Sequence, residues 1–176
     1  KRERLRKRSV IELVNLQEAL ELPEGVDSSE FFADYCPPLP PNYEPQEDEP
    51  KAIGWLLDQR SFKRRARKNF TDKQWRMHRW AYARLTEKVD GQIQVILDAL
   101  KQSGRENNTL VIFTSDHGDN DASHKMEHKT TLYEESANIP FAAMWKGQIP
   151  AGQVNSTHLV SNGLDLLPTL CDYVGV

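Results

Sequence analysis

Residues 115–129 hold the side chains whose types and spacing are best suited to chemistry. Asp116 and His117 stand side by side in this stretch, and a carboxylate next to an imidazole offers oxygen and nitrogen donors to a divalent cation. Gly118 follows directly, and we expect it to relieve backbone crowding where a ligand approaches. The pair indicates a metal site, with ordinary solvation of a loop as the other interpretation of the same side chains.

Further along the same stretch come three side chains that can donate hydrogen bonds to an anion: His124, His128 and Lys129. On residue type alone, a lysine in such a position is more often a solvated side chain than an anion ligand. The chemistry open to these residues therefore depends on the elements that position them.

A buried strand is expected directly before Asp116 and His117. Residues 109–114 form a continuous apolar run that is rich in β-branched side chains and bounded by polar turns. This pattern is typical of a strand covered on both faces, and hence of a parallel sheet. Ligands bind at the carboxyl ends of such strands in α/β folds. We therefore expect Asp116 and His117 to project from the end of this strand into one crevice.

A long helix is expected before that strand. Residues 71–74 have the form of a capping box, and apolar residues then recur every three or four positions as far as Leu100. The pattern predicts a helix over 71–104, with Gly104 as its terminator. The face expected to be buried consists of Leu85, Val89, Ile93 and Ile96.

The remaining segments complete an α/β chain. The sequence predicts a short helix over 10–22, a strand over 140–145 and a helix over 164–173. Seven prolines between residues 22 and 50 predict an extended loop there. A cluster of basic side chains at 62–68 precedes the long helix and is expected to be a solvated face.

Composition argues against several classes of function. The 23 basic residues against 26 acidic ones give a formal net charge of −3, which argues against a nucleic-acid partner. No apolar run approaches the roughly 20 residues that span a bilayer, so no membrane partner is expected. The two cysteines, Cys36 and Cys171, stand in no paired motif and predict neither a disulfide framework nor a zinc site.

A family resemblance rests on residues 108–119, His124 and residues 129–136. Together they resemble the second metal-ligand segment of the type I sulfatases, a family of the alkaline-phosphatase-like superfamily. In the family motif a lysine falls thirteen residues after the aspartate, and Lys129 stands thirteen residues after Asp116. The order and the spacing of these residues both match.

The resemblance continues on both sides of this motif. It is strong over 82–176, including a D-x-x-P-T segment at 165–169, and weaker over 23–60. It implies two parts: a helix plus proline-rich loop segment over 1–60, and the C-terminal part of a sulfatase-like catalytic domain over 61–176. The implied fold class is α/β, a partial alkaline-phosphatase-like sandwich with a mostly parallel or mixed sheet flanked by helices.

The resemblance also implies an activity, the hydrolysis of sulfate esters on a sulfated small molecule or glycan. Asp116 and His117 are the implied ligands of a divalent cation, Ca²⁺ or else Mg²⁺. Lys129 is expected to contact the sulfate group, and His124 to lie near the sulfate or the leaving-group oxygen. The family implies a periplasmic, lysosomal or secreted location, and the sequence leaves the oligomeric state open.

The nucleophile of a sulfatase is missing from these 176 residues. The family needs a C-x-P-S-R or S-x-P-S-R segment whose Cys or Ser becomes formylglycine, and an upstream pair of aspartates that completes the metal site. The nearest similar segment begins at Cys36, but Leu39 and Pro40 stand where Ser and Arg are needed, so Cys36 is rejected as the nucleophile. The chain opens on Lys1 rather than Met, which suggests a fragment or a processed chain. Because the nucleophile segment is missing, we expect the fragment to be inactive alone, with formylglycine upstream.

Two other functions fit the same residues. One is a phosphodiesterase or phosphonate hydrolase of the same superfamily, because Asp-His-Gly after a buried strand serves phosphoryl transfer equally well. The T-L-Y-E-E-S run at 131–136, after Lys129, favours a sulfatase. The other is a non-catalytic remnant that binds an ion or a partner. A C-x-P-S-R segment in the same protein would separate the enzyme from the remnant.

Overall fold

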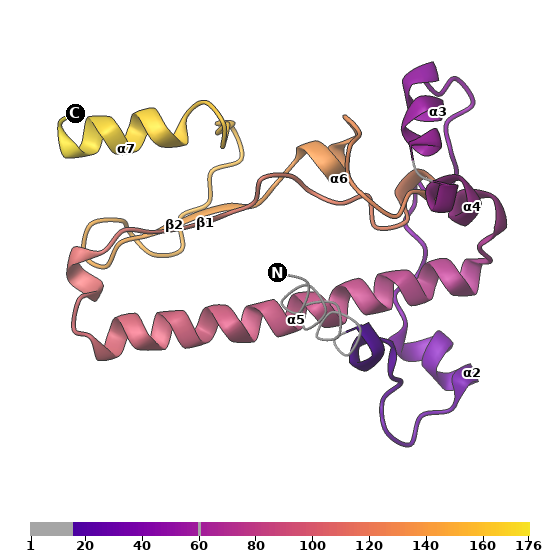
Figure 1. The fold of residues 1–176 in the computed structure, drawn as a ribbon. Helices are drawn as coiled ribbons and strands as arrows, with labels where there is room; N and C mark the ends of the chain where they lie inside the picture. The colour runs from indigo at the N-terminus through magenta and orange to yellow at the C-terminus, as the bar shows by residue number, and fades with distance from the viewer. Residues whose placement is uncertain (1–15, 60) are drawn as a thin grey trace, which may run out of the picture. The chain divides into compact units, whose positions relative to one another are not determined.

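The computed structural model describes residues 16–59 and 61–176 (Figure 1). Of the helix predicted over 10–22, residues 16–20 are helical, and the part before residue 16 lies outside the described residues. The elements that follow are, in chain order, α2 (Ser28–Glu30), a π-helical turn (Phe31–Tyr35), α3 (Lys51–Asp58), α4 (Ser61–Asn69), α5 (Asp72–Gln102), β1 (Val111–Thr114), α6 (Glu134–Ala137), β2 (Phe141–Met144) and α7 (Leu166–Val174), with 3-10 turns at Glu106–Asn108 and Ser123–Lys125.

The chain divides into two compact units. The first comprises the residues up to Ile93 together with Asp119–Thr131, and the second comprises Gln94–Gly118 together with Leu132–Val176. One boundary falls inside α5. The segment Asp119–Thr131, the site loop, therefore belongs to the first unit although it follows β1 in the sequence.

Helix α5 is the longest helix among the described residues, with 31 residues. Its start is the predicted capping box: the backbone N–H of Gln74 donates to Thr71 Oγ1 over 3.3 Å, and the backbone N–H of Thr71 donates to Gln74 Oε1 over 2.9 Å. Past its end, Gly104 takes the left-handed conformation with φ 71°. The long helix predicted from sequence is thus confirmed, within two residues at its carboxyl end.

The expected burial of the helix face is wrong. Val89 and Ile96 are 51% and 68% exposed, and Leu85 and Ile93 are only half-buried. An amphipathic stripe indicates that one side of a helix is apolar, but it does not show which part of that side other segments of the protein bury. In the first unit, other segments pack on the amino-terminal part of α5, where Trp75 and Ala81 are buried.

Trp75 is the centre of the core in the first unit. It is completely buried and packs with Tyr43, Ala66 and Ala122, which come from the proline-rich loop, α4 and the site loop respectively. The Trp75 ring also meets Phe70 edge to face, with 5.5 Å between ring centroids. One aromatic side chain therefore joins three segments that are far apart in the sequence.

Two arginines of α5 hold the proline-rich loop. Arg76 donates hydrogen bonds to the carbonyl oxygens of Phe32, Cys36 and Pro37 over 2.5, 2.5 and 2.9 Å. Arg79 donates to the carbonyl oxygen of Pro38. Proline has a carbonyl acceptor but no N–H, so a proline-rich segment has fewer donors than acceptors and needs further donors from elsewhere. The loop is therefore a strap fixed to α5, and residues 37–45 are called the proline strap below.

The second unit contains a two-stranded sheet. Strand β1 pairs with β2 in antiparallel register, with Val111 opposite Met144 and Thr114 opposite Phe141. The α/β class is confirmed. Three residues of β1 are half-buried and Phe113 is 46% exposed, so the expectation of a strand covered on both faces, and of parallel pairing, is not met by the described residues. No helix in the described part of the chain has the length and apolarity needed to cross a bilayer.

We predict that Trp75→Ala lowers the free energy of unfolding by about 3–5 kcal/mol, because it leaves a cavity where three segments meet. The matched control is Trp55→Ala on α3, since Trp55 is 71% exposed and its loss should change stability by roughly 0.5 kcal/mol or less. Chemical denaturation followed by circular dichroism measures both. Equal losses in the two variants would contradict this assignment of the core.

Candidate active site

Asp116 and His117 directly follow the end of β1 in the second unit. Asp116 Oδ2 lies 3.4 Å from His117 Nε2. On the other side of the ring, His117 Nδ1 lies 2.7 Å from the carbonyl oxygen of Gly118. Because a carbonyl only accepts, Nδ1 carries the proton in this contact, and a neutral His117 then has its lone pair at Nε2. A carboxylate oxygen and an imidazole lone pair therefore lie side by side, close enough to bind one cation.

Gly118 is required by a close approach of the chain to itself. A Cβ at this position would lie 1.9 Å from the backbone oxygen of Glu135 and 3.2 Å from that of Asn138. The Gly118 N–H donates to the carbonyl oxygen of Ser136 over 2.9 Å. The crowding that the sequence indicated is thus with the α6 backbone rather than with a ligand. This contact fixes the turn that follows Asp116 and His117.

His124 lies in the site loop of the first unit and is buried, with 6% of its surface exposed. Its backbone N–H donates to the carbonyl oxygen of Asn42 over 2.8 Å, and its Nε2 lies 3.4 Å from Asn42 Nδ2. The proline strap therefore holds both the backbone and the ring of His124. Holding is needed because His124 has φ 54°, a left-handed conformation that a residue with a side chain rarely adopts.

The turn that carries Lys129 is braced on both sides. Asn120, which is completely buried, donates to the carbonyl oxygen of His128 and accepts from Thr131 Oγ1 over 3.3 Å. Lys63 of α4 donates to Thr130 Oγ1 over 3.3 Å. The side chain of Lys129 is exposed while its sequence neighbours are held. The turn thus presents one lysine from a fixed backbone.

The contact between the site loop and α5 contains ionisable side chains whose pKa values are shifted. Burial raises the pKa of the Asp121 carboxyl, and the Arg79 guanidinium, 3.0 Å away, opposes that shift. Burial lowers the pKa of the His78 imidazole, against the attraction of Asp121 and Asp119. His78 is therefore held in its neutral form at neutral pH, and the Arg79–Asp121 ion pair ties the loop to α5.

Cys36 is unsuited to nucleophilic chemistry. It is 4% exposed, and burial raises the pKa of its thiol although Arg76 and Arg79 oppose the shift. A protonated, buried thiol is a weak nucleophile. Its place at the end of the π-helical turn, where its carbonyl accepts from Arg76, agrees with a structural role.

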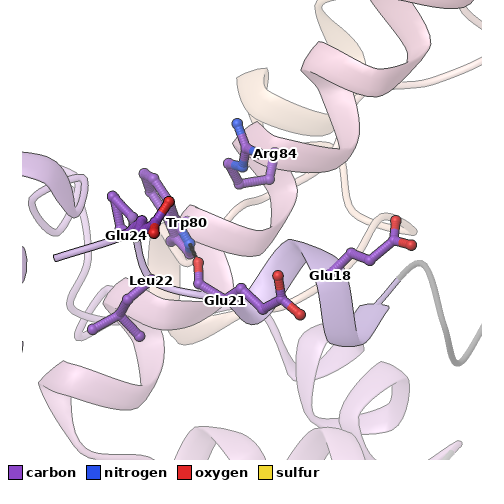
Figure 2. A pocket seen from close by; sticks show the side chains of 7 residues that line it. Glu18, Glu21, Leu22, Glu24, Trp80 and Arg84 are labelled. Atoms are coloured by element: carbon purple, nitrogen blue, oxygen red, sulfur yellow. Dashed lines mark hydrogen bonds between the residues drawn. The ribbon is translucent and has the colours of Figure 1, made fainter. Parts of the chain in front are cut away.

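A separate hollow lies between the helical residues 16–20 and α5 (Figure 2). Its lining carries three carboxylates against one guanidinium and consists of Glu18, Glu21, Leu22, Pro23, Glu24, Trp80 and Arg84. The indole N–H of Trp80 already donates to the carbonyl oxygen of Glu21 over 3.2 Å. None of the predicted site residues lines this hollow, and its negative charge disfavours a sulfate ester.

The family model described as Sulfatase matches residues 32–176. The chain belongs to the sulfatase family. The matched range contains the proline strap, α5, β1 and the whole site loop. The resemblance stated from the sequence is thus confirmed.

Relatives among sulfatases cover most of this chain but a minor part of their own length. The chain is 31% identical to the Delta 4,5-hexuronate-2-O-sulfatase of Bacteroides thetaiotaomicron, over 86% of this chain and 32% of that protein. It is 38% identical to an endo-4-O-sulfatase of the same organism, over 56% of this chain and 19% of that protein. A solved structure described as a 2-O GAG sulfatase aligns with a TM-score of 0.72 and 26% identity, over 92% of this chain and 34% of that one. The chain thus spans about a third or less of the length of these sulfatases.

The four predicted site residues fall into two pairs within this chain. Asp116 and His117 lie together in the second unit, and His124 and Lys129 lie on one loop in the first. Among the described residues, no group of three or more His, Cys, Asp and Glu side chains is arranged to hold a metal ion. Two donors of this chain are therefore a partial set of ligands at most.

The sequence did not indicate the residues that hold these side chains. Asn42, Lys63 and Arg79 contact the site loop from other segments, and Asn120 braces it from within. The first three lie far from the loop in the sequence, and no spacing links them to it. One usable signal was the proline-rich composition of the strap, which calls for arginine donors on a neighbouring element.

We predict that Gly118→Ala distorts the turn after β1, because the new Cβ would overlap the Glu135 carbonyl oxygen, which is backbone and cannot rotate away. The full-length protein should lose thermal stability and any activity that depends on Asp116 and His117. The control is Gly163→Ala in the same unit, where a Cβ would meet nothing within 4 Å. Unchanged melting temperature and activity in Gly118→Ala would show that this close approach is absent in solution.

Proposed function

We propose that this chain forms the metal-binding and sulfate-binding part of an enzyme that hydrolyses sulfate esters on carbohydrates. The observation that carries the proposal is the pair of donors after β1, Asp116 and His117, in a chain of the sulfatase family. Lys129, thirteen residues after Asp116 on a braced turn, supports it. Two relatives are named as a Delta 4,5-hexuronate-2-O-sulfatase and an endo-4-O-sulfatase. These names support a sulfated carbohydrate as the substrate class.

In this proposal Asp116 and His117 hold a divalent cation, calcium or magnesium. The Asp116 carboxylate is the oxygen ligand that either cation prefers. His117 would add a nitrogen donor 3.4 Å away, and the hydrogen bond from Nδ1 to Gly118 orients its ring. Both cations take more than two ligands, so the remaining ones would come from other residues of the full-length protein, from water or from the substrate. When bound, the cation would neutralise negative charge on the sulfate oxygens.

Lys129 is proposed to bind the sulfate group directly. Its ammonium would face the sulfate oxygens, on which negative charge grows as the ester bond breaks, and a fixed cation at that point lowers the barrier. The brace of Asn120 and Lys63 on the neighbouring residues serves this role, since an ammonium that is positioned beforehand needs no rearrangement during the reaction.

His124 is proposed to lie near the sulfate or the leaving-group oxygen. An imidazole there can donate a proton to the oxygen of the departing alcohol. The contact with Asn42 keeps the ring in one orientation. The nucleophile, formylglycine by family resemblance, is proposed to lie outside these 176 residues, because Cys36 is buried and lacks the required motif.

We predict that Lys129→Ala in the full-length protein lowers kcat/KM for a sulfate ester by about 100-fold or more, the scale expected for one charged contact with the transition state. The fold should stay intact because the Lys129 side chain is exposed. A suitable control is Lys125→Gln in the same loop, since Lys125 is paired with Glu44 over 2.6 Å. Sulfate release is measured for both variants. Unchanged kinetics in Lys129→Ala would show that Lys129 does not bind the sulfate group.

We further predict that Asp116→Asn weakens binding of the divalent cation by about 10-fold or more, since it replaces a charged oxygen ligand with a neutral one. Isothermal titration calorimetry of the chelator-treated full-length protein with calcium measures the affinity for the cation without requiring activity. Asp172→Asn, on the exposed surface of α7, is the control of equal charge change. Equal affinities in Asp116→Asn and wild type would contradict the metal role.

A further inference from the structure

Lys63 is the one basic residue of α4 that is buried, with 6% of its surface exposed. Its neighbours on the helix have carboxylate partners: Arg64 pairs with Asp58 over 2.5 Å, and Arg67 pairs with Glu49 over 2.7 Å. Lys63 has no ion pair among the described residues, and its ammonium donates to the neutral hydroxyl of Thr130 over 3.3 Å. A side chain expected to belong to a solvated face is thus buried without a counter-charge.

Such a position is unfavourable for a cation in the unliganded protein. Moving an ammonium out of water costs free energy that a neutral hydroxyl only partly returns, and buried charges are therefore normally paired. Arg64 and Arg67, on the same helix, follow that rule. An unpaired buried ammonium is instead suited to a site where the counter-charge arrives with a ligand.

The position of Lys63 relative to the site loop indicates which ligand. Thr130 is the next residue after Lys129, and its hydroxyl donates to the Lys129 carbonyl oxygen, which leaves its lone pairs for Lys63. Beside Lys63 on α4, the ring of Phe62 meets that of His128 edge to face, 6.2 Å away. Helix α4 thus packs on the turn that presents Lys129.

We propose that Lys63 is a second cationic contact for the anionic substrate, next to Lys129. The proposal rests on the proposed function and deepens it: the Lys63 ammonium binds an oxyanion of the substrate, either the sulfate that is cleaved or a carboxylate on the same sugar. Thr130 holds the ammonium in place until the anion binds. The site then takes a substrate with more negative charge than Lys129 alone can balance.

The test measures KM and kcat of the full-length protein with two substrates, a sulfated uronic acid and an aryl sulfate that carries no carboxylate. Lys63→Met removes the charge at nearly the same length, and Lys63→Arg keeps the charge. Thr130→Val removes the hydroxyl, keeps the branched shape and leaves Lys63 charged, so it measures the loss of the brace on the Lys129 turn without a loss of charge. Lys68→Met, at an exposed basic residue of the same helix, is the matched control for the loss of charge. We expect Lys63→Met to raise KM at least 10-fold for the sulfated uronic acid and Lys63→Arg to recover much of the loss. Thr130→Val should raise KM clearly less than Lys63→Met, and Lys68→Met should stay within about threefold of wild type.

The pattern across the substrates identifies the oxyanion. A rise in KM for the uronic acid alone assigns Lys63 to the carboxylate, and a rise for both substrates assigns it to the sulfate. If Lys63→Met and Thr130→Val lose activity equally, Lys63 only braces the turn and the proposal is wrong. The same conclusion follows if Lys63→Met leaves both KM values unchanged. Should Lys63→Met not fold, Lys63→Gln removes the charge and keeps a donor for Thr130.

A second measurement separates this proposal from the proposed function. If wild type releases sulfate from neither substrate, the proposed function fails, and stabilisation by inorganic sulfate or by free glucuronate, a uronic acid, still tests Lys63. In that case we expect one of the two anions to raise the melting temperature of wild type and of Thr130→Val but not of Lys63→Met. An equal rise in all three proteins with each anion would overturn the anion-binding role of Lys63.

Discussion

The first unit depends on the hydrogen bonds from two arginines of α5 to backbone carbonyl oxygens of residues 32–38. Prolines at 37–45 leave a segment rich in acceptors and poor in N–H groups, and Arg76 and Arg79 donate to the carbonyl oxygens of Pro37 and Pro38. Arg76 also donates to Phe32 and Cys36, just before the strap. Arg79 also pairs with Asp121 of the site loop. The same helix surface therefore fixes the strap and the loop, and the strap in turn fixes His124 through Asn42.

Local rules predicted the local parts of this structure. The capping box at Thr71, the length of α5 and the turn residue Gly104 follow from interactions within a few residues, and the sequence contains everything they need. The positions of Asp116 and His117 after a strand were predictable for the same reason. Family spacing added Lys129, whose role in sulfate binding stays a prediction.

Which side chains are buried depends on tertiary packing, and the periodicity of the sequence does not predict it. The apolar stripe on α5 is real, but Trp75 and Ala81 find cover while Val89 and Ile96 do not. Likewise, a basic run at 62–68 has the composition of a solvated face, yet its helix turns Lys63 inward to Thr130. Which member of such a cluster is buried depends on the partner segment, and that segment lies more than sixty residues further along the chain.

The backbone conformation of the site loop lowers the stability of the protein. Ala122, Lys125 and Thr130 have φ values of 76°, 51° and 84°, and each such left-handed residue costs about 1 kcal/mol or more. Glycine at these positions would relieve the strain, yet it would also loosen the loop that carries His124 and Lys129. A substitution that relaxes the backbone at these positions would thus gain stability and lose the geometry of the loop at the same time.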